Sequence, residues 1–189
     1  GNYAFANRSA LTQRLREALR EQHGRDGGLD VVYDVSHNIA KIEEHRVHGS
    51  SCTCCVHRKG ATRALGGDHP ELADAFSGVG QPVLVPGDMG TASWVLAGPT
   101  SGGNDAFSSS CHGAGRRLSR TAARKSVDSD ALMEMLEARG IHVRVKTPNV
   151  LSEEAPEAYK DVDEVIRLTS EAGLARPVAR LRPIAVIKG

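Results

Sequence analysis

The chain has 189 residues, enough for one domain with a hydrophobic core. Its 24 basic and 23 acidic residues nearly cancel, so the net charge points to no class of partner. No apolar run approaches the roughly 20 residues of a membrane-spanning helix, and the first residues lack the apolar core of a secretory signal. We therefore expect no membrane association. The chain starts without Met and runs at once into structured-looking sequence, so we expect further sequence upstream of Gly1.

Four cysteines bear on the compartment and on metal binding. Three of them, Cys52, Cys54 and Cys55, crowd into four positions, which makes a poor disulfide framework and predicts a reducing cytoplasm. The cluster lacks the second, separated ligand pair that zinc sites usually show. In a strand, Cys52 and Cys54 would share one face and Cys55 would face the other way, so we interpret them as small packing residues.

A helix is expected near the N-terminus. Ser9 can cap it, and Leu11, Leu15 and Leu19 recur every four residues, so they would form one apolar stripe. The helix should end where the glycine-rich loop of residues 24–28 begins.

Strands are expected where β-branched residues gather between glycines and prolines. The predicted strands are residues 29–35, one or two short strands within 41–58 with a turn at Gly49, and residues 82–85, 92–96, 141–145, 178–181 and 184–187. His37 and Asn38 should follow the first of these strands, at an end where a rigid sheet can hold working residues. A loop is expected over residues 98–103.

Three more helices are expected after residue 115. A basic helix is predicted over residues 116–125, the next should begin at Asp128 or Asp130, and the last should run from Asp161 to about residue 172. A short helical turn is expected at His69. The apolar residues predicted on the inner side of the middle helix are Leu132, Met135 and Leu136.

The segment from Ser110 to Arg116 combines a histidine with glycines and cations. Gly113 and Gly115 would let the backbone approach a bound group, and a following helix N-terminus would attract phosphate. A neutral imidazole can attack phosphorus without first losing a proton, so His112 is a candidate nucleophile. Arginines that repeat every four residues would add charge on one helix face: Arg116, Arg120 and Arg124. The alternative is a glycine-rich turn before a solvated basic helix.

Two other segments could contact a nucleotide or nucleic acid. The loop of residues 86–91 follows a predicted strand, and its N–H groups, with Ser93, could bind a nucleotide; a plain β-turn is the alternative. The basic residues 57–63 could hold RNA phosphates or form a surface turn. His37 could ligate a metal through one ring nitrogen, although a structural histidine is the alternative.

Six ordered blocks resemble the RtcB family of GTP-dependent RNA ligases. They read DVSHNIAK (34–41), VHRKGATRA (56–64), GQPVLVPGDMGTAS (80–93), CHGAGR (111–116), EEAPEAYKDV (153–162) and AVIKG (185–189). The resemblance implies an α+β fold with mixed and antiparallel sheets and flanking helices. In that fold, residues 1–189 would be the C-terminal part of a single catalytic domain, incomplete without its N-terminal half.

The resemblance also implies a reaction. Family members join RNA ends that carry a 2′,3′-cyclic phosphate or 3′-phosphate to ends that carry a 5′-hydroxyl, with GTP and divalent manganese. By resemblance, His112 attacks the α-phosphate of GTP and forms a histidine–GMP intermediate. The guanylyl group then passes to the RNA 3′-phosphate, and the 5′-hydroxyl displaces GMP. Transfer-RNA splicing and RNA repair both fit this chemistry. A non-catalytic GTP- or RNA-binding module, or an inactive ligase fragment, is the alternative.

The site residues are implied one by one. His37 matches a manganese ligand, and Asn38 matches a nucleotide contact. Arg116 and Arg120 match positions that contact phosphate of the RNA. Asp88 would accept hydrogen bonds from the guanine N1–H and amino group. The positions matched to the nucleotide pocket are Pro86, Gly87, Asp88, Met89, Ser93, Gly113, Ala114, Gly115, Tyr159 and Lys188.

The chain departs from the family pattern in its metal ligands. The remaining manganese ligands of the family are an Asp, a Cys and two His from the N-terminal half, and no segment here resembles them. We therefore expect the isolated chain to be poorly active or inactive until that half completes it. The expected partners are GTP, RNA such as transfer-RNA halves or broken RNA, the N-terminal half, and archease, which often assists family members.

Overall fold

A computed structural model describes residues 1–24 and 28–188; the side chains of residues 148, 149 and 188 lie outside the described part. The chain divides into two compact units, Gly1–Thr62 (unit 1) and Arg63–Gly189 (unit 2), which we describe separately. Among the residues described, no helix has both the length and the apolar character needed to cross a bilayer. That residues 1–189 belong to one catalytic domain stays a prediction.

Unit 1 begins with a long helix, α1 (Asn2–His23), which ends at Gly24 in the left-handed conformation. The predicted end is confirmed, but the predicted start is wrong, because Ser9 lies inside the helix. No proline or glycine between Asn2 and Ser9 interrupts the helical hydrogen bonds, so the helix extends through that segment. None of its residues is buried, and the predicted apolar stripe is open, with Leu11 56 % exposed.

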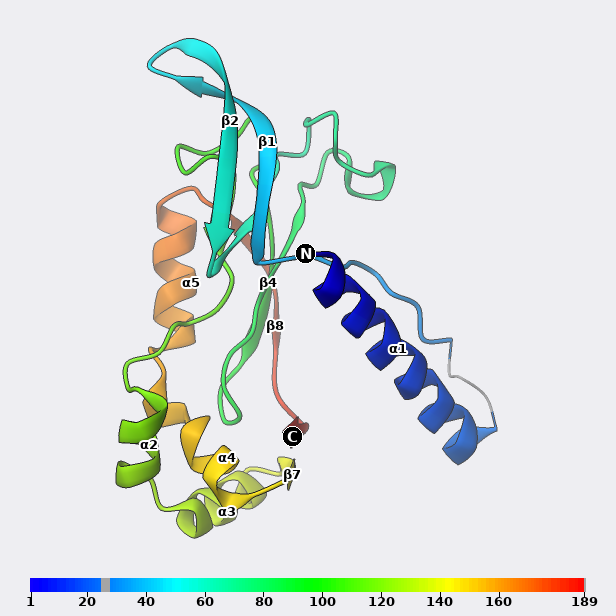
Figure 1. Ribbon diagram of the computed structural model, residues 1–189, viewed down its shortest axis with the longest axis vertical. Coiled ribbons are helices and arrows are strands. Elements are labelled where there is room, and N and C mark those ends of the chain that lie inside the picture. Colours follow the sequence, from blue (N-terminus) through cyan, green and yellow to red (C-terminus); the bar gives the residue numbers. More distant parts are fainter. Residues whose placement is uncertain (25–27, 189) are drawn as a thin grey trace. The chain divides into compact units, whose positions relative to one another are not determined.

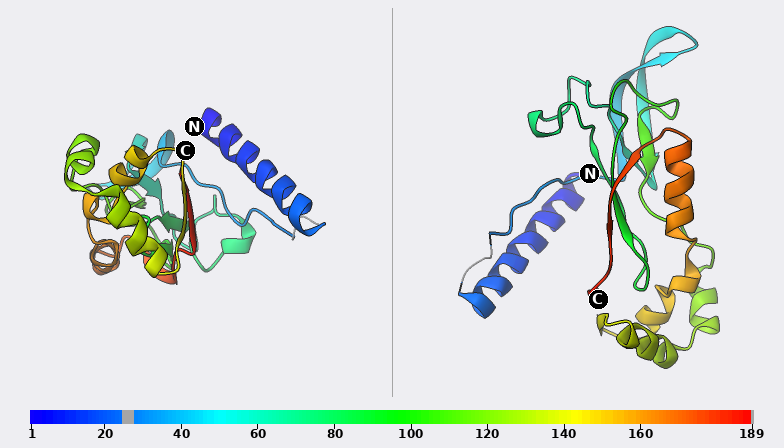
Figure 2. Two further views of the ribbon diagram at one scale, coloured as in Figure 1. Left: turned by 90° about the horizontal axis from the view of Figure 1, so that it is seen from below. Right: turned by 180° about the vertical axis from the view of Figure 1, so that it is seen from behind.

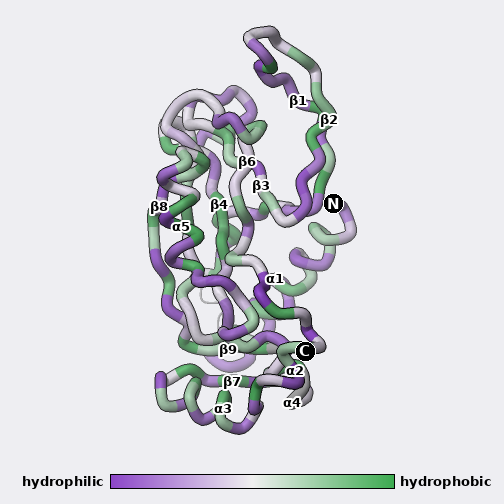
Figure 3. Tube along the Cα trace, turned by 90° about the vertical axis from the view of Figure 1, so that its left-hand side faces the viewer, coloured by the Kyte–Doolittle hydropathy of each residue, from purple (hydrophilic) through white to green (hydrophobic). Residues whose placement is uncertain are grey.

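The rest of unit 1 is dominated by one antiparallel hairpin of β1 (Asn38–Val47) and β2 (Ser50–Lys59). The turn places His48 and Gly49 at positive φ, as the right-handed twist of a two-residue hairpin favours. Exposed and partly buried residues alternate along β2, and Figure 3 shows hydrophilic and hydrophobic segments mixed along both strands. Two strands with a turn at Gly49 are thereby confirmed, although each is longer than expected.

The strand predicted at residues 29–35 is wrong. This segment has no strand assignment, although Leu29 accepts a hydrogen bond at 2.9 Å from the Arg16 guanidinium of α1. β-branched side chains favour an extended backbone, but a strand also needs a neighbour for its hydrogen bonds. Consequently, His37 and Asn38 stand at the beginning of β1 and do not follow a strand.

Unit 2 is built on a three-stranded antiparallel sheet ordered β4 (Pro82–Val85), β5 (Ser93–Ala97) and β8 (Arg176–Leu181). Helix α5 (Val162–Glu171), capped by Asp161 as predicted, lies alongside this sheet (Figure 1). One hydrophobic cluster joins sheet and helix: Ala64, Val83, Val85, Leu96, Ala114, Val162, Ile166 and Ala175. Three short elements complete the region: β3 (Ala61–Arg63), which spans the boundary between the units, the 3₁₀ turn η1 (Asp74–Phe76) and β6 (Ser109–Cys111).

The remaining helices of unit 2 gather at one end of it (Figure 2). They are α2 (Arg120–Ser126), α3 (Ser129–Ala138), α4 (Pro148–Glu153) and the 3₁₀ turn η2 (Pro156–Ala158). Nearby, β7 (His142–Val145) pairs in parallel with β9 (Ala185–Lys188). The predicted cap Asp128 is confirmed, as are Leu132 and Leu136 in the core. A second hydrophobic cluster lies here: Met89, Leu132, Leu136, Ile141, Leu151 and Ala155.

The basic helix begins later than predicted. Ser119 caps α2, and Arg116 forms an isolated antiparallel bridge with Tyr159. The four-residue repeat of arginines therefore lies on one helix face only for Arg120 and Arg124. The overall class, α+β with mainly antiparallel strand pairs and flanking helices, is confirmed.

Candidate nucleotide and nucleophile site

His112 stands directly after β6, in a short loop of residues 112–115 that we call the histidine loop. Residues on either side of His112 are anchored. The Cys111 thiol lies 3.3 Å from the Thr169 hydroxyl of α5, and the Ala114 side chain belongs to the cluster under the sheet. His112 itself is partly exposed. The fold thus holds the histidine between two fixed points and leaves it accessible.

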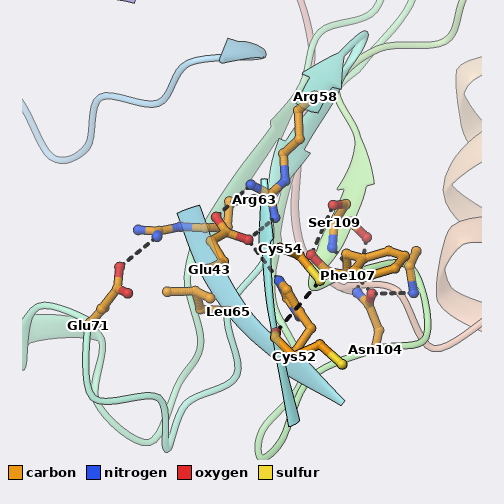
Figure 4. Close-up of polar contacts among 12 residues, drawn as sticks. Glu43, Cys52, Cys54, Arg58, Arg63, Leu65, Glu71, Asn104, Phe107 and Ser109 are labelled. Atoms are coloured by element: carbon orange, nitrogen blue, oxygen red, sulfur yellow. Dashed lines mark hydrogen bonds and ion pairs between the residues drawn. The ribbon is translucent and has the colours of Figure 1, made fainter. Parts of the chain in front are cut away.

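Asn104 fixes the loop that leads into β6. Its carbonyl oxygen accepts hydrogen bonds from the backbone N–H of Ala106 and Ser109, and its amide donates to Ser109 O and Leu174 O, both at 3.0 Å (Figure 4). An amide that satisfies four backbone groups is a strong constraint on loop geometry. No spacing in the sequence singled out this residue, since its partner Leu174 is 70 positions away.

The predicted nucleotide loop, residues 86–91, closes on itself. Ser93 Oγ accepts a hydrogen bond from Gly87 N at 3.2 Å. The two Asp88 carboxylate oxygens accept from Gly90 N and from the Thr91 hydroxyl, both at 2.8 Å. Val85, which precedes the loop, lies in the hydrophobic cluster between the sheet and α5. Met89, inside the loop, has its side chain in the second cluster, with Leu132 and Leu136. Met89 can therefore offer a ligand its backbone more readily than its side chain.

The two loops approach each other at Gly113. A Cβ on Gly113 would meet only Pro86 O, at 3.9 Å, which is ordinary van der Waals contact. A Cβ on Gly87, by contrast, would lie 2.0 Å from Ala92 O. The packing of the chain therefore requires glycine at 87, whereas at 113 it leaves space in which another group could lie.

A third predicted segment joins them. Lys160 N donates to Gly115 O at 2.9 Å, and Arg117 N donates to Ala158 O at 2.7 Å. These bonds flank the bridge between Arg116 and Tyr159. Unit 2 thus brings together the histidine loop, the residue 86–91 loop and Tyr159, which are far apart in the sequence.

A cleft of about 960 Å³ opens beside these segments, and both Asp88 and Tyr159 line it. Five lysine and arginine residues line the cleft. Arg180 forms an ion pair with Asp163 at 2.9 Å, whereas the other four have no ion-pair partner within the described part of the chain. These four are Arg117, Arg139, Lys160 and Arg182. Unpaired cations around a cleft favour an anionic ligand. The sequence reasoning did not anticipate Arg139 or Arg182.

The predicted RNA contacts, Arg116 and Arg120, both lie near carboxylates at the C-terminal end of α4. Arg120 is 70 % exposed and its Nε is 3.7 Å from Glu153, which also lies 3.4 Å from Nε of Arg124. Arg116 is more enclosed and pairs with Glu154 at 3.4 Å. No local pattern in the sequence indicated that Glu153 and Glu154 would be these partners.

The other predicted residues lie in unit 1 or at the chain end. His37 and Asn38 are exposed residues of unit 1. The Lys188 side chain lies outside the described residues. Nowhere in the described part of the chain do three or more His, Cys, Asp or Glu side chains gather as a metal site would need. The described residues therefore do not fit a manganese centre by themselves.

The predicted basic loop of residues 57–63 is wrong, because residues 57–59 belong to β2 and residues 61–63 form β3, which leaves Gly60 alone between the two strands. Arg58 is 3 % exposed and forms two hydrogen bonds of 2.8 Å with the Glu43 carboxylate, which His45 also contacts at 2.9 Å (Figure 4). A buried arginine in a bidentate pair links the two strands of the hairpin and does not offer its charge to RNA.

The predicted alternation of the cysteines is confirmed. Cys52 and Cys54 are partly buried on the face of Arg58, and Cys55 is exposed on the other face, 3.4 Å from the His57 ring. None of the four cysteines, Cys111 included and all within the described residues, is joined in a disulfide.

Asp163 at the edge of the cleft gives a first prediction. Hydrogen bonds from Arg180 and then from the Trp94 indole lower the pKa of this carboxyl. Because the folded pKa is depressed, the interaction stabilises the protein above the ordinary aspartate pKa and is lost as pH falls through the lower, folded value. Trp94 is the one tryptophan, so its fluorescence reports on this contact.

We expect Trp94 emission to stay constant from neutral pH through the ordinary titration range of aspartate and to change only in stronger acid. Asp163→Asn should abolish that acid transition, and Asp130→Asn, at an exposed position on α3, should leave it intact. A transition centred in the ordinary aspartate range would contradict the prediction.

Comparison with known proteins shows the family of the chain. A family model described as tRNA-splicing ligase RtcB matches residues 1–189. A tRNA-splicing ligase RtcB of Thermococcus kodakarensis is 52 % identical over 191 residues, which cover 100 % of this chain and 40 % of that protein. An RNA-splicing ligase RtcB of Mycobacterium tuberculosis is 53 % identical over 188 residues, 100 % of this chain and 43 % of that protein. The chain thus spans less than half of these relatives, and it belongs to the RtcB family.

Proposed function

We propose that this chain carries the nucleophile and much of the GTP pocket of an RNA ligase that joins 2′,3′-cyclic phosphate or 3′-phosphate ends to 5′-hydroxyl ends. The observation that carries the proposal is the convergence of the histidine loop, the residue 86–91 loop and Tyr159 in unit 2. Family membership supports the reaction class, since the relatives are described as RNA ligases.

The chemistry of these residues fits a nucleotide. The space at Gly113 would admit a phosphate beside His112, and backbone N–H groups of the loops would bind its oxygens. In the proposed step, an imidazole nitrogen of His112 forms a bond to the α-phosphorus of GTP, and the bond from that phosphorus to the bridging oxygen breaks. Pyrophosphate leaves, and the guanylyl group then passes to the RNA 3′-phosphate, from which the 5′-hydroxyl displaces GMP.

Manganese and the rest of the enzyme belong to the same proposal. His37 would be one metal ligand, and the others would come from outside the described residues. Open apolar surface supports a further protein partner for each unit: α1 has no buried residue, and the sheet of unit 2 exposes Leu84 and Leu181. The proposed partner is the N-terminal portion of an RtcB protein, and archease would assist the completed enzyme.

The test uses a completed protein, which we define as this chain joined to the N-terminal segment of the Mycobacterium tuberculosis relative. With manganese and GTP radiolabelled at the α-phosphate, the protein should acquire a label that acid removes and alkali does not, as a phosphorus–nitrogen bond predicts. GTP labelled at the γ-phosphate should leave no label, because pyrophosphate departs. Added RNA with a 3′-phosphate should take up the label. An acid-stable label, or none, would contradict the proposal.

A second candidate is a non-catalytic GTP- or RNA-binding fragment, which the lack of a metal cluster among the described residues favours for the isolated chain. We expect the isolated chain to transfer little or no GMP to RNA. Robust transfer by the 189-residue chain alone would refute that expectation.

A further inference from the structure

The hydroxyl of Tyr159 has two hydrogen-bond partners within the protein. It donates a hydrogen bond to Glu154 Oε2 and accepts one from Arg116 Nη1 at 2.9 Å. The guanidinium carbon of Arg116 lies over the Tyr159 ring, 4.8 Å from its centroid. Tyr159 also lines the cleft. With the hydroxyl held by these two partners, the ring is the part of the side chain that remains to meet a ligand there.

Arg116 is engaged to the same degree. Its Nε donates to Leu118 O at 3.0 Å, its Nη1 also reaches Glu154 at 3.4 Å, and its Nη2 donates to Glu153 O at 2.5 Å. Every nitrogen of the guanidinium therefore has a partner within the chain. Arg120 is 70 % exposed, and its ion pairs with the described residues are longer than 3.5 Å, so its donors are available to an outside anion.

Glu154 links the two residues. One of its oxygens faces Arg116 and the other faces Tyr159, so the carboxylate fixes both partners at once. The backbone bridge between Arg116 and Tyr159 sets their spacing, and the Lys160 N–H to Gly115 O bond ties that bridge to the histidine loop. The ring is thus positioned relative to His112 by covalent neighbours and hydrogen bonds together.

We propose that Glu154 and Arg116 are positioning residues that hold the Tyr159 ring as a fixed platform for a purine base in the cleft. This inference rests on the proposed function and deepens it. Arg116 covers one face of the ring, and the opposite face can stack on any base. Stacking would supply affinity and orientation, whereas discrimination among bases must come from polar groups elsewhere in the cleft. The proposal also gives the two arginines different roles. Arg116 acts through Tyr159, and Arg120 is the one placed to bind phosphate of the RNA.

The contact between Glu154 and Tyr159 can be detected through the pKa of Tyr159, which a residue that does not touch Tyr159 would leave unchanged. Burial raises the pKa of Tyr159, and the hydrogen bond and negative charge of Glu154 raise it further, against a lowering by Arg116. Glu154→Gln keeps the shape and removes the charge, so it should lower the pKa of Tyr159. An ultraviolet titration of tyrosine ionisation, with Tyr159→Phe subtracted to identify the residue, measures this shift.

The binding test uses the completed protein and a fluorescent GTP analogue. Glu154→Gln and Arg116→Lys should each weaken its binding about fivefold, the loss of roughly one hydrogen bond's contribution to ring placement. Tyr159→Phe, which keeps the ring, should stay within about twofold to fivefold of the unmodified protein, and Tyr159→Ala should lose at least about tenfold. Glu137→Gln, at an exposed position on α3, is the matched control and should change neither binding nor the pKa of Tyr159.

Three outcomes would overturn the inference. Tyr159→Phe as damaging as Tyr159→Ala would mean that the hydroxyl meets the ligand. Unchanged nucleotide binding in Glu154→Gln, with a normal denaturation midpoint, would remove the positioning role. Arg116→Lys that weakens RNA binding and spares the nucleotide would assign Arg116 to the RNA. Failure of the unmodified protein to bind the analogue at all would instead overturn the proposed function, and the inference with it.

Discussion

Covalent guanylyl labelling of the completed protein is expected to disappear when His112 is replaced by alanine. The side chain follows β6 in a loop anchored by Cys111 and Ala114, and alanine offers no nitrogen to form a bond with phosphorus. Because removal of a nucleophile eliminates the covalent step, we expect labelling to fall by at least about a hundredfold. The measurement is acid-labile label per protein at saturating GTP and manganese.

The matched control for this substitution is His142→Ala. His142 lies in the same unit, is exposed on β7, and has no role in the proposed site. It should label as the unmodified protein does, and both variants should keep the denaturation midpoint of unit 2. Label that survives His112→Ala would show that another residue is the nucleophile, and the assignment of His112 would be wrong.

The elements that sequence patterns predicted best are those with strong local signals. Pro82–Val85 is a run of β-branched and apolar residues that starts at a proline, and Asp161 caps α5 by accepting hydrogen bonds from Asp163 N and Glu164 N. The strand and the helix cap both depend on residues that lie within a few positions of each other in the sequence. For the same reason the caps at Asp128 and Gly24 were predictable.

Two of the errors came from long-range pairing. Residues 29–35 have the composition of a strand, but composition does not supply a hydrogen-bonding neighbour. Arg116 has good helix propensity, yet its pairing with Tyr159, 43 positions away, draws it out of the helix, and α2 begins at Arg120. Tertiary contacts of this kind override local propensity, and periodicity cannot reveal them.

The candidate site also contains residues that the sequence predicted and residues that it did not. Family resemblance pointed to the residue 86–91 loop, the histidine loop and Tyr159, and unit 2 brings these segments together. The groups that hold them, Asn104 and Glu154, had no recognisable spacing, because each acts on partners set by the fold. The metal-binding role of His37 stays a prediction, as does the role of Lys188.

The core beneath the residue 86–91 loop leads to the second large expected effect. Leu136 of α3 is fully buried in the cluster with Met89, and a Cβ built on Gly90 would lie 3.4 Å from its Cδ2. Leu136→Ala would leave a cavity under that loop and should destabilise unit 2 by about 3 to 4 kcal/mol. With a typical urea dependence of about 2 kcal/mol per molar, the unfolding midpoint followed by Trp94 fluorescence should fall by roughly 1.5 to 2 M.

The control is the same leucine-to-alanine substitution at a position where about half of the side chain is exposed. Leu168 on α5 is 51 % exposed, so Leu168→Ala deletes the same atoms with little loss of packing and should shift the free energy of unfolding by less than about 0.5 kcal/mol. Equal shifts for the two variants would mean that Leu136 does not support the core. Because the Met89 side chain packs in the same cluster, Leu136→Ala should also weaken binding of the fluorescent GTP analogue under conditions where the variant remains folded. Unchanged binding there would separate the loop from the core that we place beneath it.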